Sequence, residues 1–170
     1  DGKETEQEVI ERLTEEFGQQ NAVKQFNLGV KHYEGEGVPQ DFKEAVKWYT
    51  KAAEQGYASA QFNLGYMYDK GEGVTENDEE AVKWWWKAAV QGDARAQNSL
   101  GTQFEKGAGV AKDNVSAYAW YDIAAYNGEE DGSKYRDLLA KKMTPEQIAK
   151  AQELSKELLK KIEANKAKKE

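Results

Sequence analysis

One set of residues occurs three times between Ala22 and Gly128, at a constant spacing of 36 residues. Each copy contains a Leu-Gly pair, a Gly-x-Gly-Val stretch, a tryptophan and an Ala-Ala pair that precedes a further glycine. The glycines of the Leu-Gly pairs are Gly29, Gly65 and Gly101, and no insertion separates the copies. A constant period of this length indicates a stacked repeat protein, in which each unit buries its apolar face against its neighbours.

Each copy predicts two helices. The first helices are expected over residues 22–34, 58–70 and 94–106. They end at the Gly-x-Gly stretch, because glycine adopts the left-handed conformation that closes a helix C-terminus. Glycine within a helix costs about 1 kcal/mol relative to alanine. Its recurrence in the middle of the first helices therefore predicts a close approach between helices.

The second helix of each copy has a strong start signal. Good N-cap residues stand at its beginning, namely Asp41, Asn77 and Asp113. Glu44 and Glu80, three residues after the first two caps, predict capping boxes, in which the glutamate side chain binds the backbone N–H of the cap residue. The glycines that follow the Ala-Ala pairs are expected to end these helices.

Helices are also expected on both sides of the repeats. Residues 4–17 show helical periodicity, and their apolar face would cap the first repeat; it consists of Val9, Ile10, Leu13 and Phe17. At the other end, residues 133–142 predict a helix with Tyr135, Leu138 and Leu139 directed inward. Thr144-Pro145-Glu146-Gln147 then predicts the start of a long closing helix with an apolar stripe.

The chain is thus divided into a helical cap at each end and three repeats. The expected boundaries are 1–20 for the N-terminal capping helix, 21–57, 58–93 and 94–129 for the repeats, and 130–170 for the C-terminal capping helices with a basic tail.

Composition argues against several classes of function. The net charge is −7, which disfavours nucleic acid or an anionic membrane as the main target. The chain has no cysteine and a single histidine, His32, so neither a Cys-His pair nor a standard Ser-His triad is available. No Gly-Lys-Ser/Thr follows the glycine-rich loops. We therefore expect no enzyme activity, no cofactor and no metal site.

The sequence says little about cellular location. It has no apolar run of about 18 residues, so no membrane span is expected. The sequence begins at Asp1, which fits a mature secreted chain without its signal peptide or a trimmed chain. We expect a periplasmic or secreted protein, with a cytoplasmic one as the alternative.

The repeated motif resembles a known family of helical repeats. Its Leu-Gly-x-x-aromatic pattern is similar to the tetratricopeptide motif, but Gln25, Gln61 and Gln97 stand where that motif has tryptophan. Together with the Gly-x-Gly-Val loop, the Asp or Asn cap and the tryptophan of the second helix, the pattern resembles Sel1-like repeats. The resemblance implies an all-α, right-handed αα-superhelix whose first helices line a concave face. It also implies a bacterial adaptor or scaffold that binds other proteins.

Positions that vary between the copies are free to specify a partner, and by resemblance those on the first helices face the concave groove. The expected groove residues are Val23, Phe26, Asn27, Val30, Tyr33, Ser59, Phe62, Asn63, Tyr66, Asp69, Arg95, Asn98, Ser99, Thr102 and Glu105. Asparagine side chains can bind a peptide backbone. A peptide or protein segment is the expected ligand, and a carbohydrate or peptidoglycan strand is the alternative, because aromatic rings and asparagine also suit sugars. An ordinary exposed face is the third interpretation.

A second candidate surface involves the outer helices. Trp86 follows two other tryptophans and stands at a position that is polar in the other copies. With Val90 and Tyr126 it would form an exposed apolar patch for a partner or a second copy of the chain. Packing against the terminal helix is the competing explanation, and a monomer or weak homodimer is expected.

Overall fold

The computed structural model describes residues 5–168, which contain eight helices and no strand. The helices are α1 (Glu6–Glu34), α2 (Phe42–Glu54), α3 (Ala58–Lys70), α4 (Asp78–Ala89), α5 (Ala94–Lys106), α6 (Asn114–Tyr126), α7 (Glu130–Ala140) and α8 (Pro145–Ala167). In this part of the chain, no helix combines the length and the apolar character needed to cross a membrane.

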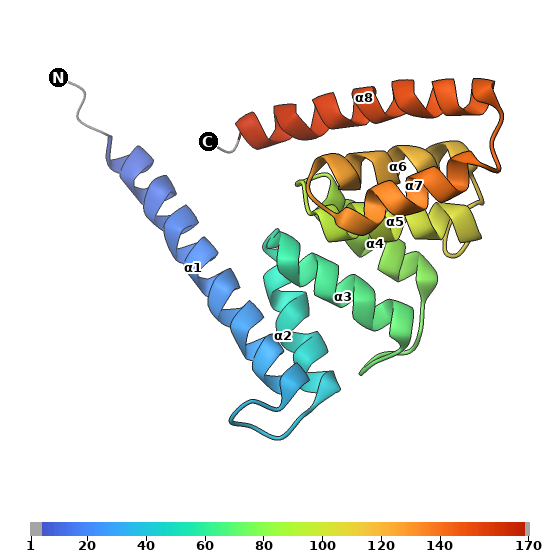
Figure 1. Cartoon of the computed structure of the whole chain (residues 1–170). Coiled ribbons are helices and arrows are strands. Elements are labelled where there is room, and N and C mark those ends of the chain that lie inside the picture. The colour runs from blue at the N-terminus through green and yellow to red at the C-terminus, as the bar shows by residue number, and fades with distance from the viewer. Residues whose placement is uncertain (1–4, 169–170) are drawn as a thin grey trace.

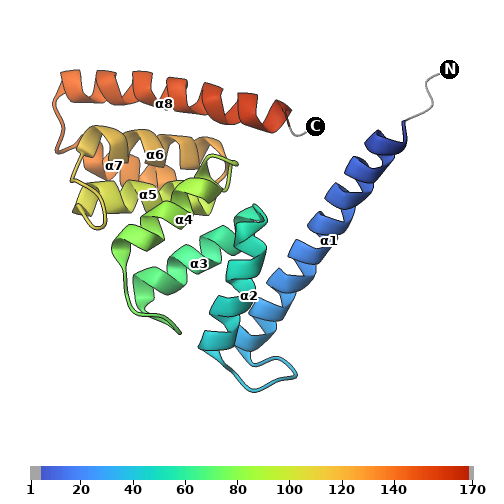
Figure 2. The ribbon, with the colours of Figure 1, turned by 180° about the vertical axis from the view of Figure 1, so that it is seen from behind.

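The helices form a stack in which successive elements are neighbours. Each helix from α1 to α6 packs against the next one along the chain, and both α7 and α8 pack against α6 (Figure 1). The view from behind shows the same order, with α1 at one end of the stack and α8 at the other (Figure 2). The prediction of an all-α solenoid built from three two-helix repeats is confirmed.

The N-terminal part differs from the sequence prediction. A capping helix over residues 4–17 and a separate repeat helix from residue 22 were expected, but a single helix, α1, covers both. It begins after Thr5 with a capping box and projects beyond the stack (Figures 1 and 2). The side chains of Val9, Ile10 and Leu13 lie outside the described residues, and Phe17 is 66% exposed. Phe17, the one residue of the expected capping face whose side chain the structure describes, is therefore exposed to solvent.

The mid-helix glycines mark the points where the two helices of a repeat meet. A Cβ atom on Gly29 would lie 2.5 Å from Cδ1 of Tyr49, and one on Gly101 would lie 2.5 Å from Cδ1 of Tyr121. In the second repeat the indole of Trp85 takes this place beside the corresponding glycine. The predicted close approach is confirmed, and it brings an aromatic ring of the second helix onto the backbone of the first.

The loops between the helices are held by hydrogen bonds that recur in each repeat. The predicted N-caps are confirmed, because their side chains accept backbone N–H groups of the first helical turn; they are Asp41, Asn77 and Asp113. The predicted capping boxes are wrong. Glu44 and Glu80 bind the lysine three residues further on, at Lys47 and Lys83.

The backbone explains why the glutamates are not needed at the caps. The N–H of Asp41 donates to the carbonyl of His32 at 2.8 Å, and the other two cap residues donate to Tyr68 and Phe104 at 2.9 Å. Each N-cap N–H therefore already has a partner at the end of the preceding helix. This bond also fixes the direction in which the second helix of the repeat starts.

A buried glutamine replaces the tryptophan of the tetratricopeptide motif. The side-chain amide of Gln97 donates to the carbonyl of Ala89 at 3.0 Å, and its oxygen accepts from Asn127 at 2.9 Å. Gln61 makes the equivalent pair of bonds in the second repeat. One side chain thus joins the end of the preceding repeat to the end of its own repeat.

The C-terminal helices close the stack. Thr144 caps α8 with the predicted capping box, and Leu139 of α7 is buried as predicted. Leu138 was expected to point inward, but it is 48% exposed, because its neighbour Leu139 packs in a core cluster with residues of α6 and successive helical residues point about 100° apart.

A polar bridge holds both closing helices on the last repeat. The carboxylate of Asp122 on α6 accepts from Arg136 of α7 at 2.8 Å and from Ser155 of α8 at 2.6 Å. A single side chain of the last repeat therefore contacts both elements that end the stack.

Candidate concave binding site

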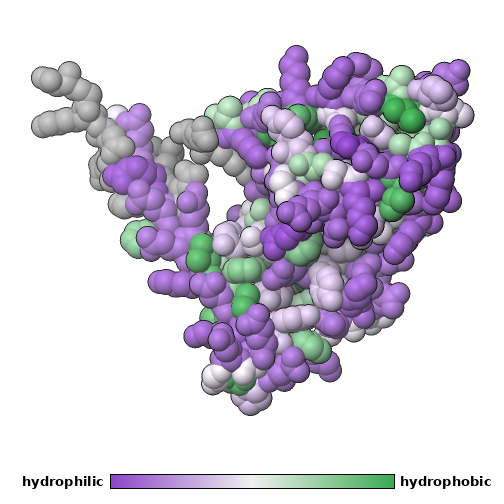
Figure 3. Space-filling view, viewed as in Figure 1, coloured by the Kyte–Doolittle hydropathy of each residue, from purple (hydrophilic) through white to green (hydrophobic). Residues whose placement is uncertain are grey.

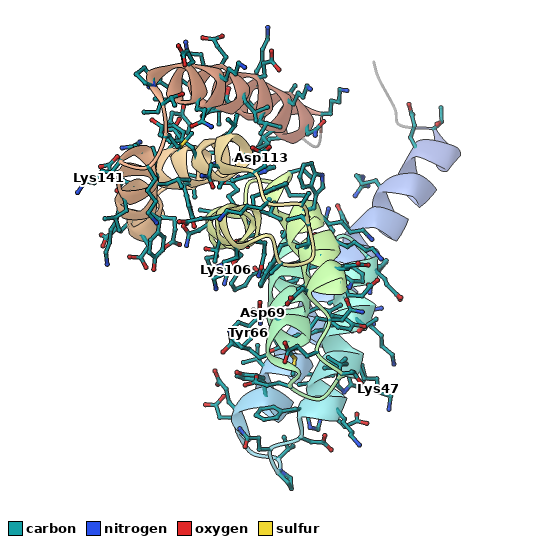
Figure 4. All side chains as sticks on the ribbon, turned by 90° about the vertical axis from the view of Figure 1, so that its right-hand side faces the viewer. Lys47, Tyr66, Asp69, Lys106, Asp113 and Lys141 are labelled. Carbon is teal, nitrogen blue, oxygen red and sulfur yellow. The ribbon has the colours of Figure 1, made fainter. Side chains whose placement is uncertain are left out.

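The structure gathers five of the predicted groove residues around one pocket. The pocket has a volume of about 270 Å³ and lies between α1 and α3. The predicted residues that line it are Val30, Tyr33, Phe62, Asn63 and Tyr66. Figure 4 places Tyr66 and Asp69 together on one side of the molecule, with Lys47 of α2 on the opposite side. The pocket therefore opens on the side lined by first helices.

Three further pocket residues were not among the predicted groove residues: Glu34, Tyr49 and Met67. Tyr49 belongs to a second helix and is almost fully buried, and it reaches the pocket because Gly29 allows its ring to lie against α1. The repeated Leu-Gly pair is the sequence signal that could have indicated this contact. Glu34 is the last residue of α1, where the sequence places the end of the repeat helix.

Tyrosine hydroxyls and carboxylates meet at this pocket. Burial raises the pKa of Tyr33 to about 12, with further contributions from a hydrogen bond to Glu72, from its charge and from Tyr66. Burial also raises the pKa of Tyr49; a hydrogen bond with Asn63 opposes this shift and the charge of Glu34 adds to it. The negative potential of the two carboxylates thus disfavours further negative charge in the pocket.

A second, larger depression lies at the other end of the first repeat. It has a volume of about 720 Å³ and lies between α1 and the turn that joins α2 to α3. Val23 and Ser59 of the predicted groove line it. The ring of Phe26 lies 5.7 Å from that of Tyr49 and 5.1 Å from that of Tyr57, between centroids, and Asn27 is exposed on α1.

In the third repeat, three of the five predicted groove residues bind neighbouring side chains; they are Arg95, Thr102 and Glu105. The guanidinium of Arg95 lies 4.3 Å from the ring centroid of Phe62 and is paired with Asp93. The hydroxyl of Tyr121 lies 3.2 Å from Thr102 Oγ1 and 3.0 Å from a carboxylate oxygen of Glu105.

The boundary between the second and third repeats is crossed by a further hydrogen bond. The side-chain amide of Gln103 on α5 donates to Asp69 on α3 at 3.0 Å. Asp69 also pairs with Lys70 at 2.7 Å. Asn98 and Ser99 are half-buried on α5. The predicted groove therefore has a pocket between the first and second repeats, whereas several of its residues beyond that pocket make internal contacts.

The predicted Trp86 patch is partly packed against the protein and partly exposed to solvent. The Trp86 ring meets that of Trp120 edge-on, with centroids 5.2 Å apart, and remains 41% exposed. Tyr126 is 67% exposed and Val90 is half-buried. Trp120 itself belongs to a core cluster that α8 covers with Leu158, Leu159 and Ile162. A partner-binding role for the patch stays a prediction.

The surface around these features is mainly polar. Hydrophilic residues cover most of the face in Figure 3, and hydrophobic residues form small separate groups. His32 is half-buried, at the position that Tyr68 and Phe104 occupy in the other repeats.

Solved structures with the same architecture include a Sel1 repeat protein from Oxalobacter formigenes, with 42% identity and a TM-score of 0.68 over 71% of this chain and 48% of that one. A protective antigen of uropathogenic Escherichia coli, c5321, displays an SLR fold and has 37% identity and a TM-score of 0.79 over 93% of this chain. This chain spans only 34% of that antigen. Helicobacter pylori cysteine rich protein B, at 22% identity and a TM-score of 0.58 over 79% of this chain and 99% of that one, shares the fold.

Comparison with known protein families identifies the repeats. No curated protein sequence matches the chain. Three segments, which together cover more than half of it, match the Sel1 repeat at residues 25–57, 58–93 and 94–129. The chain therefore belongs to the Sel1 repeat family.

Proposed function

We propose that this protein is a non-enzymatic scaffold that binds a peptide or protein segment along the concave side of its first two repeats. Sel1 repeats generally mediate protein–protein interaction, which supports this class of function. The observation that carries the proposal is the pocket between α1 and α3, which is lined by positions that are not the same residue in all three repeats. This pocket gathers five of the predicted groove residues, whereas the larger depression at the other end of the first repeat is lined by two of them.

The pocket has the chemistry of a peptide site. Its aromatic rings offer apolar surface that loses little side-chain entropy on binding, and aromatic residues often dominate binding energies. Asn63 carries both a donor and an acceptor, so its amide can pair with an extended peptide backbone. The pocket's volume suits one large side chain of a bound segment rather than a whole folded domain.

The proposal can be tested by selection from a random peptide library against the immobilised protein. Selected peptides should bind wild type and lose affinity on the double change Asn63→Ala and Tyr66→Ala. Tyr126→Ala removes the same ring from an exposed position on α6, in the predicted Trp86 patch, and should leave binding intact if the site lies between α1 and α3. Circular dichroism should show unchanged helix content in all variants.

Two results would contradict the proposal. Peptides that bind the double variant as tightly as wild type would place the site elsewhere. Failure to select any peptide, together with binding to peptidoglycan fragments that the double variant loses, would favour the carbohydrate alternative.

A further inference from the structure

The pocket between α1 and α3 combines aromatic walls with carboxylates. Tyr33, Tyr49, Phe62 and Tyr66 contribute rings, and Glu34 contributes a carboxylate to its lining. The face of an aromatic ring attracts a cation, and an adjacent carboxylate adds a direct charge interaction. An anionic or purely apolar side chain would gain neither interaction.

A second carboxylate stands next to the pocket. Glu72, from the loop after α3, interacts with the hydroxyl of Tyr33. Its Oε2 atom is buried and has no hydrogen-bond partner among residues 5–168. A buried carboxylate oxygen without a donor is costly, so a donor brought close to this oxygen of Glu72 would be favourable.

Two cations of the chain lie near the rings of the pocket, and each is paired with a carboxylate outside it. The guanidinium of Arg95 lies 4.3 Å from the ring centroid of Phe62 and is paired with Asp93 at 2.7 Å. The ammonium group of Lys70 lies 5.8 Å from the ring centroid of Tyr66, but it is already paired with Asp69 at 2.7 Å. Neither Glu34 nor Glu72 takes part in a salt bridge within the described part of the chain. The local charge at the pocket is therefore negative.

The equivalent position between α3 and α5 lacks an aromatic and an acidic residue that this pocket has. One repeat further on, Lys70 stands at the position of Glu34, and Thr102 stands at the position of Tyr66. The carboxylate there, Asp69, is already held by a hydrogen bond and an ion pair. The aromatic and acidic pocket between the first two repeats therefore has no equivalent of the same chemistry between the second and third repeats.

We propose that this pocket receives the side chain of a lysine or arginine from the bound segment, which makes a basic peptide the preferred ligand. The inference rests on the proposed function and specifies the chemistry of the same site. The aliphatic part of the side chain would contact Val30, and its charged end would lie among the tyrosine rings near Glu34.

The test compares peptides and variants of the full chain. Selected peptides should be enriched in lysine or arginine, and replacing that residue by norleucine should weaken binding about 10-fold. Glu34→Gln should weaken binding of the basic peptide about 3-fold, with little effect on the norleucine peptide. Glu54→Gln, on the exposed face at the end of α2, is the matched charge control and should change neither.

The inference and the proposed function fail in different ways. Selected peptides that need Tyr66 but show no enrichment in basic residues, or bind Glu34→Gln as well as wild type, would overturn the inference and leave the groove function intact. Titration of Nα-acetyl-lysine methylamide into ¹⁵N-labelled protein gives an independent check. Amide shifts around Glu34 and Asn63 that its norleucine analogue also produces would overturn the inference as well.

Discussion

The ring of Tyr49 lies so close to Gly29 that a Cβ atom on residue 29 would be 2.5 Å from Cδ1 and 2.6 Å from Cε1 of the ring. A side chain at this point must displace either the ring or the helix. The glycine of the Leu-Gly pair therefore sets the distance between the two helices of the repeat, and with it the position of the Tyr49 ring beside the pocket.

Gly29→Ala should destabilise the protein although alanine favours helix. The substitution gains about 1 kcal/mol in helix propensity but overpacks the contact with Tyr49, so we expect a net loss of about 2 kcal/mol. Gly18→Ala is a control in the same helix, because a Cβ atom added there would meet no other atom within 4 Å. This control should stabilise the protein by about 0.5 to 1 kcal/mol. Urea unfolding gives the comparison, and equal effects in the two variants would contradict the role assigned to the contact.

The glutamines that join the repeats should contribute unequally to the free energy of unfolding. Gln97 is fully buried and bonded to two other elements, so Gln97→Ala should lower the free energy of unfolding by about 2 kcal/mol. Gln25 is half-buried and binds Gln55 near the surface, so Gln25→Ala should cost about 0.5 kcal/mol. Chemical unfolding measures the difference, and a larger loss at position 25 would show that the repeats are not joined in this way.

The closing helices should depend on Asp122. Asp122→Ala removes the acceptor of both Arg136 and Ser155 and should cost about 2 kcal/mol, whereas Ser155→Ala removes one bond and should cost about 1 kcal/mol. Hydrogen exchange should become faster in α8 before it does so in α3. Unchanged protection of α8 in Asp122→Ala would mean that apolar packing alone holds this helix.

The stability of the protein at alkaline pH should depend on the raised pKa of Tyr33. Its folded pKa, about 12, lies above its ordinary value of 10.0, so the folded protein retains a proton that the unfolded chain loses. The stabilisation is complete below pH 10.0 and is lost as the pH rises towards 12. Tyr33→Phe should therefore make the fall in stability across this range less steep, while Tyr126→Phe serves as a control on an exposed residue. Identical slopes for wild type and Tyr33→Phe would contradict the assigned environment.

The sequence predicted the features that depend on local chemistry. Asp41 and Thr144 cap helices in the structure because a side-chain oxygen can reach nearby N–H groups wherever the chain starts a helix. The Leu-Gly pairs were informative because a repeated helix-breaking residue needs a reason in packing. The family and the solenoid architecture follow from these periodic signals.

Other features depend on contacts between distant residues and could not be predicted. Glu44 looked like a capping-box residue, but the N–H of Asp41 is bound by the carbonyl of His32, which the sequence does not indicate. The continuity of α1 through Gly18 could not be foreseen, since a single glycine neither ends nor continues a helix by itself. Glu72 lies in the loop after α3, and only the fold brings it next to a tyrosine of α1.

The most direct test of the groove site is to map a selected peptide onto the ¹⁵N-labelled protein by amide chemical shifts. Binding between α1 and α3 predicts the largest changes at Val30, Tyr33, Asn63 and Tyr66, and their loss in Tyr66→Ala but not in Tyr126→Ala. Changes centred on Trp86 in α4 or on α8, with the α1 and α3 resonances unmoved, would contradict it.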